Sequence, residues 1–230
     1  MAKKIYLSPS NQVENKYAYG GTNEAVQCRK IATACETALK RCGFEVKNNK
    51  IDSMEVKVSQ SDAWGADLHV PIHTNAYNGK VTGTRVFCWN KTGEGYKACR
   101  SIFSVLAPIT PGTSESITVN PDLYEIHYSD APCAYVEVDF HDVASVAKWI
   151  IEHTTEIGEA IAKGICGYFG VKYVAPVVEK PTVYHIEMGE YPTIKEADVA
   201  LAGIFGKVDD VSDAVRVLLE DLKKFKIVED

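Results

Sequence analysis

Short apolar strands alternate with helical segments along the first 170 residues, and this alternation limits the fold more than any other feature. Residues 5–7 and 66–73 are apolar runs bounded by turn-forming residues, which is typical of buried strands. Residues 24–41 carry apolar side chains at helical spacing, with Asn23 available as an N-cap and Gly43 to end the helix. Elements of these lengths in this order predict an α/β fold, with a mostly parallel twisted sheet covered by helices on both faces.

The same criteria assign the other elements of this region. Strand-like sequences lie at residues 44–46, 84–89, 123–127 and 134–140, helical patterns lie at 53–64, 95–106, 143–153 and 155–169, and 108–121 is expected to be a long loop. In a sheet of this kind, ligand sites form beyond the carboxyl ends of the strands. Polar residues at those ends are therefore the first candidates for function.

A proline-containing segment divides the chain. Residues 173–181 include Pro176 and Pro181 and have the composition of an extended, semi-rigid linker. We therefore predict a large domain at residues 1–172, a linker at 173–181 and a small C-terminal α+β module at 182–230. A length of 230 residues is sufficient for one full-sized domain and a small companion.

Composition excludes several classes of protein. The chain is 46% hydrophobic and 24% charged, as in ordinary globular proteins, and it has no run of about 20 apolar residues that would span a bilayer. A net charge of −6 argues against binding to nucleic acid, which requires clustered cations. The seven cysteines form no CxxC pair, which favours reduced, mostly buried thiols.

Three acidic or basic residues lie where such a fold would bring them to a common crevice. Glu24 is in the first turn of a predicted helix, His73 ends a buried strand, and Glu137 lies near the end of another strand. The helix dipole alone could explain Glu24, and His73 could be a hydrogen-bonded core histidine. Glu137 has apolar neighbours, so its carboxylate requires a charge partner or a function. Together the three predict a site, and a metal ion that activates water is one chemistry that they could support.

Ordered motifs in the chain resemble those of the zinc-dependent N-acetylmuramoyl-L-alanine amidases of the Amidase_3 type, which occur in autolysins and phage endolysins. The resemblance covers residues 5–169. Three motifs carry it: residues 19–24 (YGGTNE), residues 71–76 (PIHTNA) and residues 132–140 (PCAYVEVDF). The second motif is followed by GTRVF at 83–87, where the family has G-T-E-V-Y. Three motifs in the family's order and at fitting spacing are far more specific than any one of them.

The resemblance implies a function for this domain. It implies a peptidoglycan hydrolase that cuts the amide between N-acetylmuramic acid and L-alanine, with zinc held by Glu24 and His73 and with Glu137 as the general base. We also expect Asn75, His127 and His141 to contact the substrate. The expected partner is peptidoglycan, with no nucleic acid and no membrane.

The chain departs from the family at the first zinc ligand. The family's opening motif, D-P-G-H-G, corresponds to SPSNQ at residues 8–12, which places Asn11 at the position of the histidine. An amide oxygen is a poor zinc ligand beside imidazole. Asn11 or Ser10 could ligate weakly, water could fill the place, or His127 or His141 could supply the ligand. His69 is not expected to do so, because four strand residues, or about 13 Å, separate it from the ligand in the same strand.

The departure keeps two other functions open. One is a non-catalytic peptidoglycan-binding protein with a degenerate amidase fold, and the other is an unrelated α/β hydrolase that uses Glu137 without metal. The C-terminal module faintly resembles wall-binding repeats, and homodimerisation through it is the alternative. The amino terminus does not resemble a signal peptide. We therefore expect synthesis in the cytoplasm and action on the cell wall after release by a holin or by lysis.

Overall fold

A six-stranded sheet organises residues 2–177, which are the residues that the computed structural model describes. The strand order is β2-β1-β3-β6-β4-β5, and all neighbouring pairs are parallel except β4 and β6. The predicted mostly parallel sheet is thus confirmed. The strands are β1 (Lys4–Pro9), β2 (Glu45–Asn48), β3 (Leu68–Asn75), β4 (Arg85–Cys88), β5 (Ser116–Val119) and β6 (Tyr135–Phe140).

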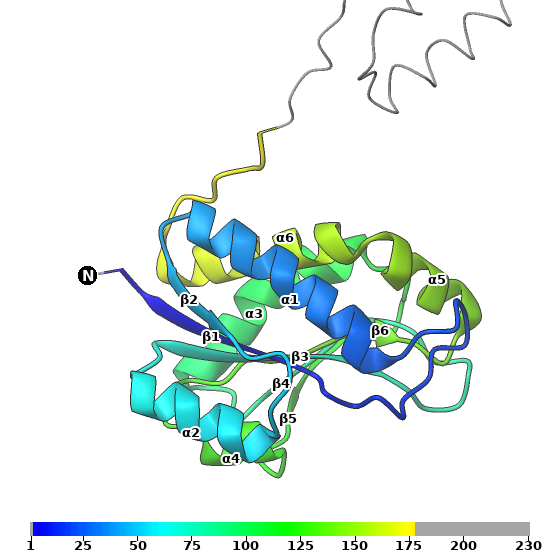
Figure 1. Ribbon diagram of the computed structural model, residues 1–230, viewed down its shortest axis with the longest axis horizontal. Coiled ribbons are helices and arrows are strands. Elements are labelled where there is room, and N and C mark those ends of the chain that lie inside the picture. The colour runs from blue at the N-terminus through cyan, green and yellow to red at the C-terminus, as the bar shows by residue number, and fades with distance from the viewer. Residues whose placement is uncertain (1, 178–230) are drawn as a thin grey trace, which may run out of the picture. The chain divides into compact units, whose positions relative to one another are not determined.

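Helices cover both faces of this sheet, as predicted. Helices α1, α3 and α6 pack together on one face, and the shorter α2 and α4 lie on the other (Figure 1). The helices are α1 (Glu24–Arg41), α2 (Met54–Trp64), α3 (Glu94–Leu106), α4 (Tyr124–Tyr128), α5 (Ala144–Glu152) and α6 (Thr154–Phe169), and a 3₁₀ turn, η1 (Ala107–Ile109), follows α3.

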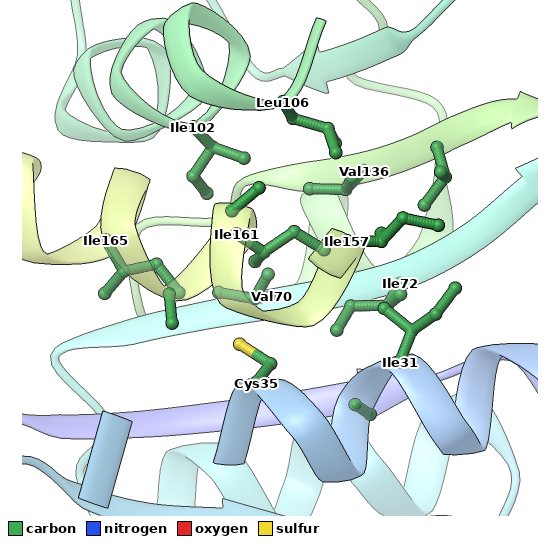
Figure 2. Packing of buried hydrophobic residues seen from close by; sticks show 14 of the residues in the cluster. Ile31, Cys35, Val70, Ile72, Ile102, Leu106, Val136, Ile157, Ile161 and Ile165 are labelled. Atoms are coloured by element: carbon green, nitrogen blue, oxygen red, sulfur yellow. The ribbon is translucent and has the colours of Figure 1, made fainter. Parts of the chain in front are cut away.

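The main hydrophobic core lies between the sheet and the larger helical layer. Figure 2 shows the isoleucines of α6 between side chains of α1, α3 and the central strands, with Ile157 and Ile161 directed towards the strands. Helix α6 approaches α3 closely at Gly164, where a Cβ atom would lie 2.4 Å from the Cα of Ile102. This close packing of α6 fixes the layer against which α1 and the site are held.

The opposite face of the sheet is unusually polar near its centre. Side chains alternate across a strand, so β3 directs Leu68, Val70 and Ile72 to the core and His69 and His73 to the face beneath α2 and α4. All five of these residues are buried. Two buried histidines on one strand face require polar partners, and these define the candidate site.

Two sequence predictions were wrong. Residues 108–121 are not an uninterrupted loop, because Ser116–Val119 form edge strand β5 beside β4. Residues 123–127 are not a strand, because Tyr124–Tyr128 form helix α4. Residues 123–127 (LYEIH) mix apolar and polar side chains as a half-buried strand does, and five residues are too few for a helical period to be recognised. Tertiary packing decides the conformation, since Glu125 and Ile126 are both buried.

The predictions on the C-terminal module, on membrane helices and on the cysteines can be compared with the structure only for residues 2–177. Contacts divide the chain into Met1–Val177 and Val178–Asp230. The predicted module at 182–230 lies outside the described residues, so its wall-binding and dimerisation roles stay predictions. Within residues 2–177, no helix is both long and apolar enough to cross a membrane. All seven cysteines are free thiols, and six of them are buried.

Candidate active site

The amino terminus of α1 places Glu24 at the carboxyl ends of the central strands. Asn23 caps the helix, because its side chain accepts a hydrogen bond from the backbone N–H of Val26 at 3.0 Å. Glu24 is 1% exposed, and its Oε1 lies 2.8 Å from Nδ1 of His73. Asn15 donates a hydrogen bond to Oε2 of Glu24 at 2.6 Å. Helix capping and the preceding loop therefore hold this carboxylate against His73.

His73 is fixed on three sides. Its Nδ1 faces Glu24, and the Nε2 amide nitrogen of Gln12 also lies 3.4 Å from Nδ1. One face of the ring stacks on Tyr135, with ring centroids 4.8 Å apart. The opposite ring nitrogen, Nε2, lies 3.9 Å from Oε1 of Glu125, which is an ion-pair distance but longer than a hydrogen bond. Glu24 and His73, two of the predicted site residues, are thus in direct contact, and Gln12, Tyr135 and Glu125 also surround His73.

Glu137 lies beside this pair on the neighbouring strand. Strand β6 pairs with β3 so that Glu137 and His73 are register partners, which directs both side chains to the same face. Oε2 of Glu137 is inaccessible to solvent and has no hydrogen-bond partner among residues 2–177. Burial raises the pKa of Glu137 from 4.5 to about 8, with a further increase from the charge of Glu24 and an opposing effect of His73. The carboxyl group is thus poised for proton transfer near neutral pH.

The pKa values of His73, Glu125 and Glu24 are shifted so that the imidazole favours its charged form and the two carboxylates favour theirs. Burial by itself would lower the pKa of His73, but the nearby carboxylates of Glu125 and Glu24 outweigh it and raise this pKa from 6.5 to about 9. Burial would raise the pKa of Glu125, but interactions with His69 and His73 outweigh it and lower this pKa to about 2. The pKa of Glu24 is also lowered, because the interaction with His73 more than offsets burial. Two carboxylates therefore stay ionised around one imidazole.

Sequence reasoning missed a buried group behind His73. His69, which we excluded as a metal ligand, places its Nε2 2.9 Å from Oε2 of Glu125, and the hydroxyl of Ser8 donates a hydrogen bond to the same oxygen. The even spacing of His69 and His73 was the available signal, since it puts both on one strand face. Glu125 gave no such signal, because its segment was assigned to a strand.

The remaining predicted site residues have different environments. The side chain of Asn11 turns away and donates to the carbonyl of Asp52 at 3.0 Å. His127 is exposed, packs beside Trp89 and lies 3.2 Å from the carbonyl oxygen of Pro121, so no described contact joins it to the site.

Two other predicted residues lie at the carboxyl edge of the sheet. His141 is buried, stacks on Tyr17 and bonds to Thr74 at 2.9 Å, while Asn75 accepts from the N–H of Ala76. A substrate contact by either of these two stays a prediction.

The charges around His73 suit a divalent cation, and two potential ligand atoms, Oε1 of Glu24 and Nδ1 of His73, already lie next to each other. Ionised Glu24 and Nδ1 of His73 face each other, and Gln12 approaches the same nitrogen. The carboxylates of Glu24 and Glu125, whose pKa values are both lowered, leave the surroundings of His73 rich in negative charge. Within residues 2–177, no three His, Cys, Asp or Glu side chains form a ready-made metal cluster. Glu24 and His73 are thus two described residues that could together hold an ion.

We expect the metal-free protein to lose stability as the pH rises from about 6.5 to 8. A group with a raised pKa in the folded state stabilises the fold below its unfolded pKa, and this stability is lost as the pH rises through the folded pKa. His73, with a folded pKa of about 9, and Glu137, with one of about 8, act in the same direction over this window. The free energy of unfolding should fall by about 1 kcal/mol or more.

Urea denaturation in the presence of a chelator at several pH values would measure this change. Glu137→Gln should show a shallower decline, because it removes one of the two titrating groups. A profile that is flat from pH 6.5 to 8 in the parent would contradict the expectation.

Comparisons with known proteins agree with the predicted family and with the fold. A family model described as N-acetylmuramoyl-L-alanine amidase, Amidase_3, matches residues 8–167. No curated protein matches the chain.

Three solved structures have the same fold at low sequence identity. The catalytic domain of the amidase CwlV from Paenibacillus polymyxa is 19% identical, with a TM-score of 0.66 over 74% of this chain and 99% of that one. An amidase from Clostridium difficile 630 is 20% identical, with a TM-score of 0.65 over 74% and 97%. The catalytic domain of the CD27L endolysin, which targets C. difficile, is 18% identical, with a TM-score of 0.59 over 72% and 97%.

Proposed function

Because this chain belongs to the N-acetylmuramoyl-L-alanine amidase family over residues 8–167, we propose that it hydrolyses the amide between N-acetylmuramic acid and L-alanine in peptidoglycan. The observation that carries the proposal is the placement of Glu137. Its carboxyl group lies beside the Glu24–His73 pair at the carboxyl edge of the sheet, and its Oε2 is buried without a hydrogen-bond partner among residues 2–177. A proton-transfer group next to a cation-binding pair is the arrangement that amide hydrolysis requires.

We propose that Glu24 and His73 hold a zinc ion. Carboxylate oxygen and imidazole nitrogen are ordinary zinc ligands. Their 2.8 Å contact is a hydrogen bond, which would have to lengthen to about 3.3 Å for both atoms to bind one tetrahedral ion. A zinc ion bound there would polarise the scissile carbonyl and make an attacking water more acidic. Asn11, at the family's first-ligand position, faces Asp52, whereas Gln12 faces Nδ1 of His73. Gln12 presents its amide nitrogen, which cannot ligate a metal, and its oxygen accepts a hydrogen bond from Asn15, so we favour solvent as the third donor.

Glu137 performs the proton transfers in this proposal. Its carboxylate accepts a proton from the attacking water and passes it to the nitrogen of the departing L-alanine. The high pKa that burial gives Glu137 makes it both a competent base and, once protonated, a competent acid. The ring of Tyr135 excludes water from one face of His73 and limits the directions from which substrate can approach.

Digestion of purified peptidoglycan by the full chain tests the proposal. We expect new amino termini on L-alanine and new lactyl carboxylates on muramic acid, and we expect a chelator to stop their release. Sedimentation of the protein with peptidoglycan should be measured in parallel. Binding without any new termini would support the degenerate binding protein instead, and release unaffected by chelation would support a hydrolase that needs no metal.

A further inference from the structure

The buried Glu125 carboxylate lies on the side of His73 opposite to Glu24, and this position gives it a separate role. The two ring nitrogens of an imidazole point in divergent directions. Nδ1 is 2.8 Å from Glu24, whereas Nε2 is 3.9 Å from Oε1 of Glu125. An ion shared by Glu24 and His73 therefore binds Nδ1, and Glu125 cannot bind the same ion through that side. The role of Glu125 must be exerted through Nε2.

The two oxygens of Glu125 have different partners. Oε2 accepts hydrogen bonds from the Ser8 hydroxyl and from Nε2 of His69, which lies 2.9 Å away. Oε1 has no hydrogen-bond partner among the described residues, although Glu125 is only 1% exposed. A buried carboxylate oxygen without a partner is costly. The nearest donor in the described contacts is Nε2 of His73, and a movement of about 1 Å would bring it within hydrogen-bond distance.

Ser8 and His69, which bond to Glu125, are themselves held in place by the sheet. His69 stacks on Tyr6, with ring centroids 5.3 Å apart, and both His69 and Ser8 belong to central strands of the sheet. Glu125 itself lies on the short helix α4, which packs on α2. The carboxylate is thereby fixed between β1 and β3 and cannot turn away from His73 without losing two hydrogen bonds.

We propose that Glu125, held by Ser8 and His69, is a positioning residue that accepts the Nε2 proton of His73 and leaves Nδ1 free to bind metal. Ligating histidines commonly donate their second ring nitrogen to a carboxylate, which fixes the tautomer and strengthens the metal bond. Removing such a partner costs roughly 10–100-fold in metal affinity. The inference rests on the proposed zinc site at Glu24 and His73.

Zinc affinity and the His73 ring proton test the role of Glu125. Zinc dissociation constants of the full chain are measured by chelator competition, and the Nε2 proton of His73 is followed by NMR in ¹⁵N-histidine-labelled, zinc-saturated protein. We expect Glu125→Gln to weaken zinc binding roughly 10–100-fold and to speed exchange of that proton with water. Asp122→Asn is the matched control, because it removes an exposed charge from the same segment.

A second variant guards against misfolding of Glu125→Gln. The double variant His69→Phe/Glu125→Leu replaces the buried polar pair by apolar groups, which is tolerated better than leaving one partner alone. It should fold, as judged by circular dichroism, and show the same weaker zinc binding. Parental affinity in either folded variant overturns the inference, as does weaker binding with an unchanged His73 proton. A parent that binds no zinc overturns the proposed metal site and this inference with it.

Discussion

Glu137→Gln is expected to reduce amide cleavage by about 10²–10⁴-fold while the fold and the bound zinc are retained. Glutamine keeps the volume and the hydrogen-bonding capacity of the side chain, but it cannot accept the proton of the attacking water. Oε2 of the native carboxyl group is buried without a hydrogen-bond partner among residues 2–177, and burial raises the pKa of Glu137 to about 8, so replacing the group by a neutral amide should not destabilise the sheet. The loss should therefore lie in catalysis.

Three measurements on the same preparations separate this role from a structural one. Release of L-alanine amino termini reports catalysis, metal analysis reports bound zinc, and thermal unfolding reports the fold. Glu152→Gln, an exposed change on α5, is the matched control and should behave like the parent. A Glu137→Gln protein that melts earlier but cleaves as fast per folded molecule would remove Glu137 from the mechanism.

His73→Ala is expected to lower bound zinc from about one ion per chain to nearly none after dialysis, and activity with it. The change removes the only imidazole nitrogen that the described structure places against Glu24. It also leaves the carboxylates of Glu24 and Glu125 facing each other across a small cavity, so the metal-free variant should be less stable than the metal-free parent.

His127→Ala is the matched control for metal binding. His127 is exposed on α4 and bonds to the carbonyl of Pro121, outside the group around His73. It should retain the parental zinc stoichiometry, measured by elemental analysis after identical dialysis. Full retention of zinc by His73→Ala, or loss of zinc by His127→Ala, would refute the assignment of the ion to Glu24 and His73.

The sequence was sufficient to predict most of the architecture. Residues 24–41 form a helix with the predicted limits, because the cap at Asn23, the apolar spacing and Gly43 are all local signals. The apolar runs that became β1, β3 and β6 are long and regular enough to be recognised without knowledge of their partners. Local signals failed at β5 and α4, which are short and owe their conformation to contacts with distant residues.

The sequence by itself selected three candidate site residues, since Glu24, His73 and Glu137 lie in the motifs that resemble those of the family. Only the tertiary structure decided what surrounds them. Glu125 meets His69 across 56 residues of sequence, and Gln12 rather than Asn11 turns towards His73. The physical reason is that a strand's alternation determines which face a side chain occupies, whereas strand order and helix packing determine what that face meets.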